Sequence, residues 1–418
     1  MSNAIKQSNY TSTASELDRR YQPNPSLQAN MISRILLAVL GTLLCWVPFR
    51  QLWRNGHVAA VVLIADVALL NAFTVLNALL WRSDDWDRWY DGAGFCDLEV
   101  YAWTPLTTVY SAAIFAIVLH LAQQVKLTRA AAAAAPTPRE RRRRAWIQAA
   151  IIFPVPVVQL VFTWFILARR YEIGTLVGCV AVYDNSWPSN LVYDAPGVVF
   201  VLASVPCACE FFVRSLLTML CYVTIRDKGG LLTRLTVLTW KRYRAISKTT
   251  HEALKSNSAA SARANRTRLR LYNMSLSILC VYLPVTIYFT TTTIQNLVAL
   301  QYQPYDYARI HGGGGQGRVY PWDAILFVPS WQIPPLALNQ PWIPIATTAV
   351  IVAFFGTTYD AVEMYRRHAV ALGLGYCFPR LREPYDPDRQ PRSGGTQRSW
   401  VALLTRGSNK GKGVSSEE

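Results

Sequence analysis

Seven long apolar stretches alternate with polar segments along this chain. We place them at about 30–50, 57–81, 98–125, 145–168, 197–222, 272–300 and 340–364. The hydrocarbon core of a bilayer is about 30 Å thick, and an α-helix needs roughly 20 mainly apolar residues to cross it. Each stretch is about that long or longer. The pattern therefore predicts an all-α membrane protein, built as a bundle of seven transmembrane helices over residues 30–364.

Two polar segments flank the predicted bundle. Residues 1–29 carry mixed charges and no secretory signal, so we expect an extracellular tail followed by a first span that stays in the protein. Residues 365–418 form the predicted cytoplasmic tail, which beyond about residue 380 is rich in Pro, Gly, Ser and Arg, so we expect it to be mostly disordered. The stretch Ala324–Leu338 is apolar but short and holds three prolines. We predict that it is a loop resting on the membrane rather than an eighth span.

The charge of the connecting segments alternates along the chain. The basic segments are 50–56, 126–144, 226–271 and the tail after 365, whereas 82–97 is acidic and 169–196 and 301–339 are nearly neutral. An excess of Lys and Arg marks the cytoplasmic side of a membrane protein. This pattern predicts an N-terminus outside the cell, a C-terminus in the cytosol, and a multi-pass protein of the plasma membrane.

The composition supports a membrane protein with basic cytosolic loops. Hydrophobic residues make up 52% of the chain and charged residues only 16%, against about 25% in soluble proteins. In a soluble protein the net charge of +17 would suggest nucleic acid as a partner. Here the basic residues fall in cytosolic segments, so we expect membrane lipids and acidic proteins as partners, and no nucleic acid.

The cysteines suggest one disulfide and one modification site. Of the eight cysteines, only Cys96 and Cys179 fall in predicted outer loops, where the oxidising environment favours a disulfide, although two unpaired thiols are the alternative. Cys377 follows the last span and is either palmitoylated or an unmodified thiol. Asn9 lies in an N-glycosylation pattern, which also occurs by chance.

Polar side chains inside the predicted spans are costly, at about 2.5–3.5 kcal/mol for a charge at the helix centre. Glu210 and Arg214 are four residues apart in the fifth span, so they share one helix face and can form a pair. The other candidates are Asp66, Asn71, Asn77 and Asp360. Two interpretations are open: polar contacts between helices, or a conformational switch or ligand anchor.

Two features suggest an inner surface that responds to conformational change. Pro284 interrupts the sixth span and acts either as a hinge or as a static kink. The basic residues expected to face a cytosolic partner are Arg139, Arg141, Arg142, Arg143, Arg144, Arg263, Arg266, Arg268 and Arg270. The alternative is that these arginines only determine the topology.

Enzyme chemistry finds little support in the sequence. The five histidines are far apart, and neither a His-Glu-x-x-His helix nor a Gly-x-Ser-x-Gly turn is present. We therefore expect no catalytic site, no cofactor and no metal. A retinal protein would need a lysine in the seventh span, which has none. A membrane transporter of unknown substrate is the alternative function, but the internal repeat typical of transporters is not evident.

Five short motifs resemble those of the fungal a-factor-type mating pheromone receptors. In chain order they are Trp53–Gly56 with the following Asn71 and Asn77, Gly94–Leu98, Arg170–Ile173 with Gly178-Cys179, Arg268–Leu271, and Phe354–Thr357 with Asp360. Together they cover about residues 30–368 in the family's order. The chain departs from the family near the inner end of the third span, where His120 and Gln123-Gln124 stand in place of the usual arginine.

The resemblance implies a G-protein-coupled receptor of seven helices. Members of this family bind a short, C-terminally farnesylated peptide from the opposite mating type and activate a heterotrimeric G protein. We therefore expect a lipopeptide pheromone and a G protein as partners, and the sequence leaves open a homodimer. The pheromone would be held by the outer loops and the outer halves of the helices, and would shift the bundle towards an open inner face.

Overall fold

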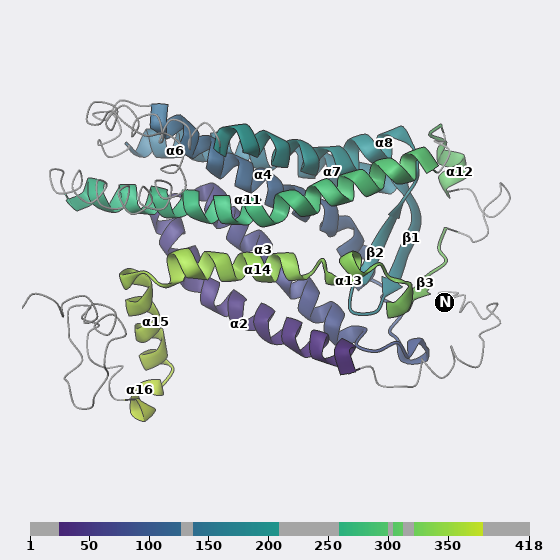
Figure 1. Cartoon of the computed structure of the whole chain (residues 1–418), viewed down its shortest axis with the longest axis horizontal. Coiled ribbons are helices and arrows are strands. Elements are labelled where there is room, and N and C mark those ends of the chain that lie inside the picture. Colours follow the sequence, from purple (N-terminus) through teal and green to yellow (C-terminus); the bar gives the residue numbers. More distant parts are fainter. Residues whose placement is uncertain (1–24, 127–136, 209–258, 300–303, 312–321, 379–418) are drawn as a thin grey trace, which may run out of the picture. The chain divides into compact units, whose positions relative to one another are not determined.

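The computed structural model describes residues 25–126, 137–208, 259–299, 304–311 and 322–378 of the 418-residue chain. The chain divides into two units, the first ending at Ala361 and the second beginning at Val362. The first unit is a bundle of long helices with a small sheet at one end (Figure 1). The second unit contributes the later part of one helix and a short final helix.

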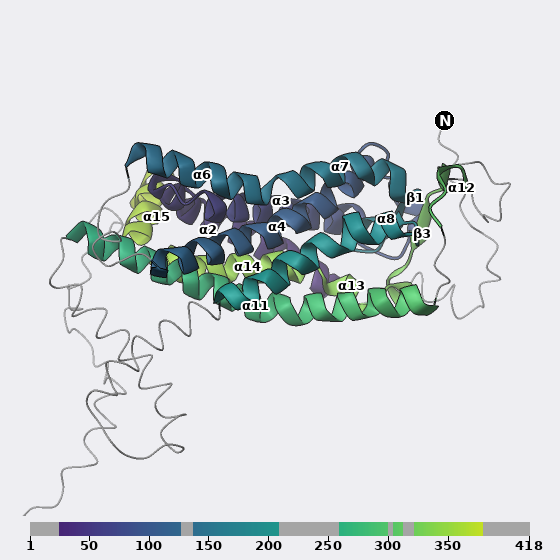
Figure 2. The same ribbon diagram turned by 90° about the horizontal axis from the view of Figure 1, so that it is seen from above.

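Seven helices in the described residues are long and apolar enough to cross a membrane. They are Pro25–Asn55, Val58–Leu80, Phe95–Gln123, Pro138–Ile166, Trp187–Ala208, Leu269–Tyr288 and Pro335–Gly356. The predicted fold of seven transmembrane helices is thereby confirmed, and the same helices run alongside one another in the second view (Figure 2).

The long helices and their continuations have the following bounds. They are α2 (Pro25–Asn55), α3 (Val58–Leu80), α4 (Phe95–Lys126), α6 (Pro138–Ile152), α7 (Pro154–Ile166), α11 (Ala259–Ala299), α14 (Trp342–Ile351), η4 (Val352–Gly356) and α15 (Tyr359–Ala371). The short ones are η1 (Trp86–Arg88), α8 (Trp187–Ser189), η2 (Asn190–Asp194), α12 (Tyr307–His311), η3 (Ser330–Gln332), α13 (Pro335–Asn339) and α16 (Leu374–Cys377).

The seventh helix ends earlier than the hydropathy predicts. The predicted span continues to residue 364, but the apolar helix stops at Gly356, and α15 begins separately at Tyr359. The Thr358 hydroxyl accepts a hydrogen bond from the Ala361 amide at 3.1 Å, which caps the start of α15. Asp360 therefore lies exposed in the first turn of a second helix, and its predicted place inside the seventh span is wrong.

Helix α4 is the centre of the bundle. Of its membrane-spanning window 72% is buried, against 28% for the window of α2. The small side chains Ala112, Ala113 and Ala116 are fully or almost fully buried on α4, which lets neighbouring helices pack closely. By contrast, α2 exposes leucines such as Leu43, as expected of a surface that faces lipid.

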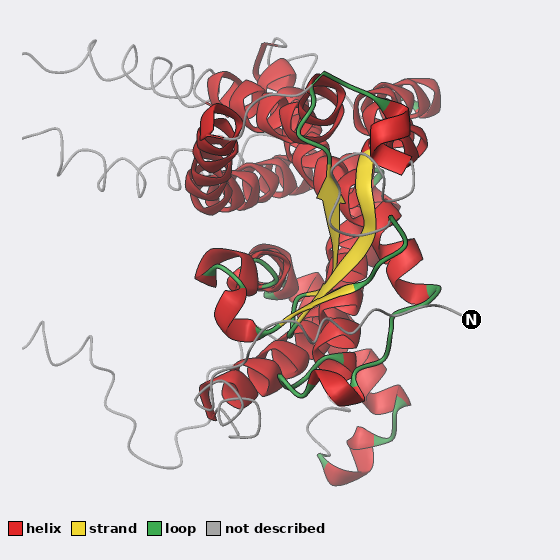
Figure 3. Ribbon diagram, turned by 90° about the vertical axis from the view of Figure 1, so that its right-hand side faces the viewer, coloured by secondary structure: helices red, strands yellow, loops and turns green. Residues whose placement is uncertain are grey.

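A three-stranded sheet, absent from the prediction, lies across one end of the bundle (Figure 3). Strands β1 (Leu167–Gly174) and β2 (Gly178–Tyr183) form an antiparallel hairpin, and β3 (Leu326–Val328) pairs with β1 in parallel. The order is β2-β1-β3. Part of the predicted membrane-resting loop Ala324–Leu338 is thus a strand, since it completes the hydrogen bonding at one edge of β1.

Candidate functional site

The sheet end comprises β1–β3, the 81–94 loop, residues 322–334 and the helix ends that contact them. A disulfide joins Cys96, in the first turn of α4, to Cys179 on β2. Both cysteines are buried in a cluster with Trp81, Tyr171 and Ile325. These are the two cysteines that the sequence pairs, and the bond fixes the hairpin to the central helix of the bundle.

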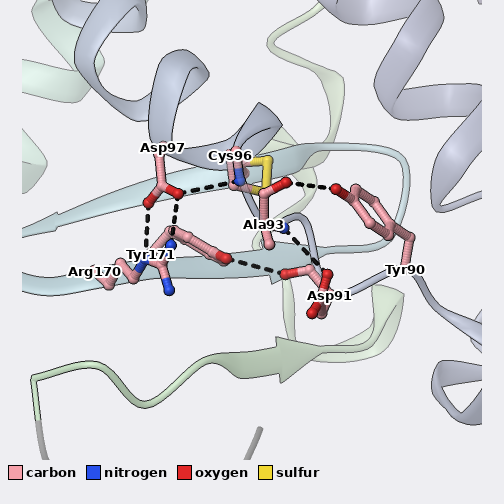
Figure 4. Close-up of polar contacts among 9 residues, drawn as sticks. Tyr90, Asp91, Ala93, Cys96, Asp97, Arg170 and Tyr171 are labelled. Atoms are coloured by element: carbon pink, nitrogen blue, oxygen red, sulfur yellow. Dashed lines mark hydrogen bonds and ion pairs between the residues drawn. A yellow bond between two sulfur atoms is a disulfide. The ribbon is translucent and has the colours of Figure 1, made fainter. Parts of the chain in front are cut away.

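A bidentate ion pair holds the hairpin to α4 beside the disulfide (Figure 4). Arg170 on β1 donates from Nε and Nη2 to the two oxygens of Asp97, at 2.7 and 2.6 Å. The next residue, Tyr171, donates its hydroxyl to the Asp91 carbonyl at 3.1 Å, and burial raises the pKa of this hydroxyl to about 12. The tyrosine therefore stays a neutral donor. The ion pair sets the position of β1 against α4, and the tyrosine sets it against the 81–94 loop.

The tip of the hairpin inserts between α2 and α3. Leu176 has a positive φ of 59° and is fully buried, and its amide donates to the Trp81 carbonyl at 2.9 Å. Gly178 has a φ of +85°, and a Cβ atom at this position would lie 2.1 Å from the Cγ atom of Asn77. Only glycine therefore allows the turn to approach α3 this closely.

A buried carboxylate connects the hairpin to two helices. The Nδ2 atom of Asn77 on α3 donates to Glu99 Oε1 at 2.6 Å and to the Val177 carbonyl at 2.8 Å. The other oxygen of Glu99, a residue on α4, accepts from the Cys179 amide at 3.4 Å. Asn77 is thus a predicted polar residue that joins elements. Glu99 is not among the predicted residues, although a charged residue inside an apolar stretch could have been recognised as a candidate from the sequence.

A fully buried arginine, Arg34 on α2, contacts two further segments, the hairpin tip and α13. Its guanidinium donates to the side chain of Asn30 at 2.7 Å and to the Leu176 carbonyl at 3.4 Å, and it also contacts the Leu338 carbonyl in α13. Arg34 is not among the predicted polar residues, although it too is a charge within an apolar run. It joins the hairpin tip to the start of the seventh span.

Asp84 makes the equivalent connection for the β3 segment. One carboxylate oxygen accepts from the Thr175 hydroxyl at 2.5 Å and from the Ser330 amide at 2.7 Å, and the other accepts from the Ser330 hydroxyl at 2.8 Å. The side chain is buried, so these bonds replace the hydrogen bonds to water that the carboxylate loses. Hydrogen bonds therefore connect the hairpin, the β3 segment and the 81–94 loop to one another, and together they cover this end of the helices.

A cavity of about 480 Å³ lies among the helices next to this cover. Its walls come from α4, from the helix containing η2, from the C-terminal part of α11 and from the start of the seventh span. The lining residues discussed below are Trp103, Thr104, Thr107, Asp194, Tyr282, Val285, Thr286, Gln340 and Ile343. Asp194 is the one charged side chain among the lining residues, which are otherwise apolar or uncharged polar.

The cavity is linked to the hairpin and to a deeper polar layer. The hydroxyl of Tyr183, the last residue of β2, lies 3.3 Å from the Thr104 hydroxyl on the cavity wall. Tyr282 lines the cavity and packs edge-on against Tyr110, with ring centroids 4.9 Å apart. Tyr110 in turn bonds Thr347 at 2.7 Å. A ligand here would touch α4, α11 and the seventh span at once.

The other two predicted polar residues of the second span, Asp66 and Asn71, lie deeper in the bundle than Asn77. Asn71 donates to Thr42 on α2 and to Thr348 on α14, at 3.2 and 2.9 Å. Asp66 is buried, and neither of its carboxylate oxygens has a hydrogen-bond partner in the described part of the chain. Asn71 therefore connects helices. Glu210 and Arg214 lie outside the described residues.

The remaining predicted residues are not brought together by the structure. Arg139 and Arg141–Arg143 lie exposed on α6, and Arg144 pairs with Glu140 on the same helix. Pro284 is an exposed residue within α11. Arg263, Arg266, Arg268 and Arg270 lie on α11, and only Arg270 has a described side chain, which is half-buried. The side chain of Cys377 and the whole of Asn9 lie outside the described part.

Two comparisons of the sequence, with a family model and with individual proteins, match proteins of the same kind. Residues 33–373 match the family model described as "Pheromone A receptor". The chain is 20% identical over 359 residues to the "Pheromone a factor receptor" of Saccharomyces cerevisiae, covering 86% of this chain and 66% of that one. It is 24% identical over 325 residues to the "Pheromone B beta 1 receptor" of Schizophyllum commune, covering 77% and 51%.

The chain thus spans less than two thirds of the length of either relative. Among solved structures, the crystal structure of squid rhodopsin aligns with a TM-score of 0.41 and 14% identity. That alignment covers 88% of this chain and 94% of the rhodopsin chain.

Proposed function

This chain belongs to the pheromone A receptor family, and we propose on that premise that it binds a farnesylated peptide pheromone and activates a heterotrimeric G protein. The observation that supports this most directly is the cavity of about 480 Å³ among the helices, whose wall the disulfide-linked hairpin contacts through Tyr183. A concave site with mainly apolar walls and a few polar groups is typical of a ligand pocket.

The lining suits a ligand with both a lipid and a peptide part. Trp103, Val285 and Ile343 offer apolar surface for an isoprenoid chain. Thr107, Thr286 and Gln340 offer groups that can bond a peptide backbone. The carboxylate of Asp194 would favour a ligand group of positive charge.

The proposed orientation places the sheet end outside the cell. Among the described residues of the first unit, most arginines lie in the segments at the opposite end, including 137–144, as expected of cytosolic loops. The disulfide at the sheet end fits an oxidising extracellular face. This orientation, at the plasma membrane, exposes the cavity end to secreted pheromone and the arginines to a cytosolic G protein.

Helix α11 is the proposed route between the two ends. Tyr282 and Thr286 line the cavity, Pro284 lies between them, and Arg268 and Arg270 lie further towards the other end of the same helix. A ligand that contacts α11 differently in two states shifts the balance between those states. Movement of this helix about Pro284 would then change the surface offered to the G protein.

Filling the cavity tests the ligand site. We expect Thr107→Trp and Ile343→Trp each to raise the pheromone concentration needed for half-maximal response at least about tenfold, a loss of about 1.4 kcal/mol of binding. The control is Leu43→Trp, since Leu43 is 68% exposed on α2. The assay is a receptor-deleted yeast reporter strain with matched surface levels, using a panel of pheromones. Unchanged responses in both cavity variants would remove the pocket from the proposal.

Purified protein tests the coupling separately. Pheromone should accelerate nucleotide exchange on a G-protein α subunit in the presence of the wild-type chain, and Pro284→Ala and Arg268→Ala should each weaken that acceleration. Exchange that is independent of pheromone and of both residues would exclude the route through α11.

A further inference from the structure

A second cavity, of about 510 Å³, lies at the end of the bundle opposite the sheet. It is formed by the turn between α2 and α3 and by the first turns of α6, and its lining residues are Trp53, Gly56, His57, Val58, Val61, Pro138, Arg141, Arg142 and Ala145. We propose that this cavity binds the head group of an anionic membrane lipid that carries more than one phosphate. We refer to it as the arginine pocket.

The first argument is charge. Arg141 and Arg142 line the pocket with exposed side chains, and in the described part of the chain neither forms an ion pair with a carboxylate. Glu140, the acidic residue beside them, pairs with Arg144 instead. Two guanidinium groups with no described counter-ion favour an anion, and guanidinium forms bidentate hydrogen bonds with phosphate.

The second argument is the direction of the helices. The pocket is lined by the first residue of α3, Val58, and by the first residue of α6, Pro138. Two helices therefore begin at its wall, and the N-terminus of a helix carries positive partial charge that attracts phosphate. The carbonyls at the adjoining end of α2 are occupied, because the Gly56 amide bonds the Trp53 carbonyl and the His57 amide bonds the Leu52 carbonyl, at 3.0 and 3.1 Å.

The third argument is a close fit between the turn and an arginine. Gly56 has a φ of +74°, and a Cβ atom there would lie 3.1 Å from both Cδ and Nε of Arg141. The stem of Arg141 thus lies against the bare backbone of the turn. This contact places the Arg141 side chain beside the pocket.

The fourth argument is depth. Trp53 on the pocket wall is 68% exposed, and Trp146, directly after Ala145, is 66% exposed. Exposed tryptophans concentrate where the hydrocarbon of a membrane meets the head groups. Beyond them, Phe153 between α6 and α7 and Val157 on α7 are exposed. The pocket therefore opens at the level of the lipid phosphates, which favours a lipid over a soluble anion, and basic pockets between membrane helices bind such head groups.

The test measures lipid binding to the purified full chain in detergent, by native mass spectrometry, without pheromone or G protein. The probes are phosphatidylinositol bisphosphate, phosphatidylserine, phosphatidylcholine and free inositol trisphosphate. The double variant Arg141→Gln/Arg142→Gln should bind the bisphosphate lipid at least about tenfold more weakly than wild type. The matched control, Arg139→Gln/Arg143→Gln, removes the same charge from the same run outside the pocket and should stay within about twofold.

A second variant separates shape from charge. Ala145→Phe keeps every arginine and fills the pocket, so it should reduce lipid binding as much as the double variant does. Equal losses in the two arginine doubles would show diffuse attraction and overturn the proposal. So would inositol trisphosphate binding as tightly as the lipid, which would indicate a soluble ligand. Because no readout involves signalling, a failed pheromone response leaves this result unaffected.

Discussion

The two ends of the bundle are organised differently. At the sheet end, buried charged side chains bond backbone and side chains that are far apart in sequence, as Arg34, Asp84 and Glu99 do. The opposite end, which holds the α2–α3 turn and the start of α6, is called the arginine end. Its described basic side chains are mostly exposed, and the ion pair Arg144–Glu140 joins residues of one helical turn. A buried group that loses its partner costs more than an exposed one. The sheet end should therefore be rigid and sensitive to substitution, and the arginine end tolerant.

The largest effect is expected at the hairpin tip. Gly178→Ala combines an unfavourable φ with a Cβ that would overlap Asn77, so we expect a loss of at least about 3 kcal/mol and low surface levels. The control is Gly94→Ala, because Gly94 also has a positive φ, +82°, but open space around it. It should cost about 1 kcal/mol. Thermal unfolding in detergent compares them, and equal midpoints would contradict the packing argument.

The buried arginine should give the next largest effect. Arg34→Lys leaves a single ammonium group in place of the fork that contacts Asn30, Leu176 and Leu338, and should cost about 2 kcal/mol. Arg54→Lys on the same helix changes an exposed side chain and should stay within about 0.5 kcal/mol. If the unfolding midpoint shifted equally in both variants, the bonds from Arg34 to the hairpin tip and to α13 would not stabilise the fold.

The ion pair beside the disulfide should contribute less. The side chains of Arg170 and Asp97 are 27% and 38% exposed, so water screens their attraction. A double-mutant cycle with Arg170→Gln and Asp97→Asn should give a coupling of about 0.5–1 kcal/mol. The coupling should fall in high salt. A salt-independent coupling would indicate packing rather than charge.

The smallest effect is expected at the arginine end. Glu140→Gln removes an exposed pair between residues four apart on α6 and should cost no more than about 0.5 kcal/mol. Thermal unfolding and surface level should both remain close to wild type. A loss as large as that of Arg34→Lys would show that the two ends do not differ in the way described here.

The sequence predicts some residues of the candidate site but not the contacts between them. The disulfide partners could be chosen from the sequence because only two cysteines fall between spans on the predicted outer side. Asn77 was recognised as a polar residue in an apolar helix, but its partner Glu99 was not. Periodicity places a residue on a face of its own helix and does not say which other segment reaches that face.

The sequence alone determined the number of membrane-spanning helices and which connecting segments are basic. These follow from the length of apolar chain that a bilayer requires and from the cost of moving charge across it. Only the tertiary structure decided the three-stranded sheet, the connections made by Arg34, Asp84 and Glu99, the early end of the seventh helix and the two cavities. Each of these depends on which distant segments come into contact, and packing in three dimensions sets that.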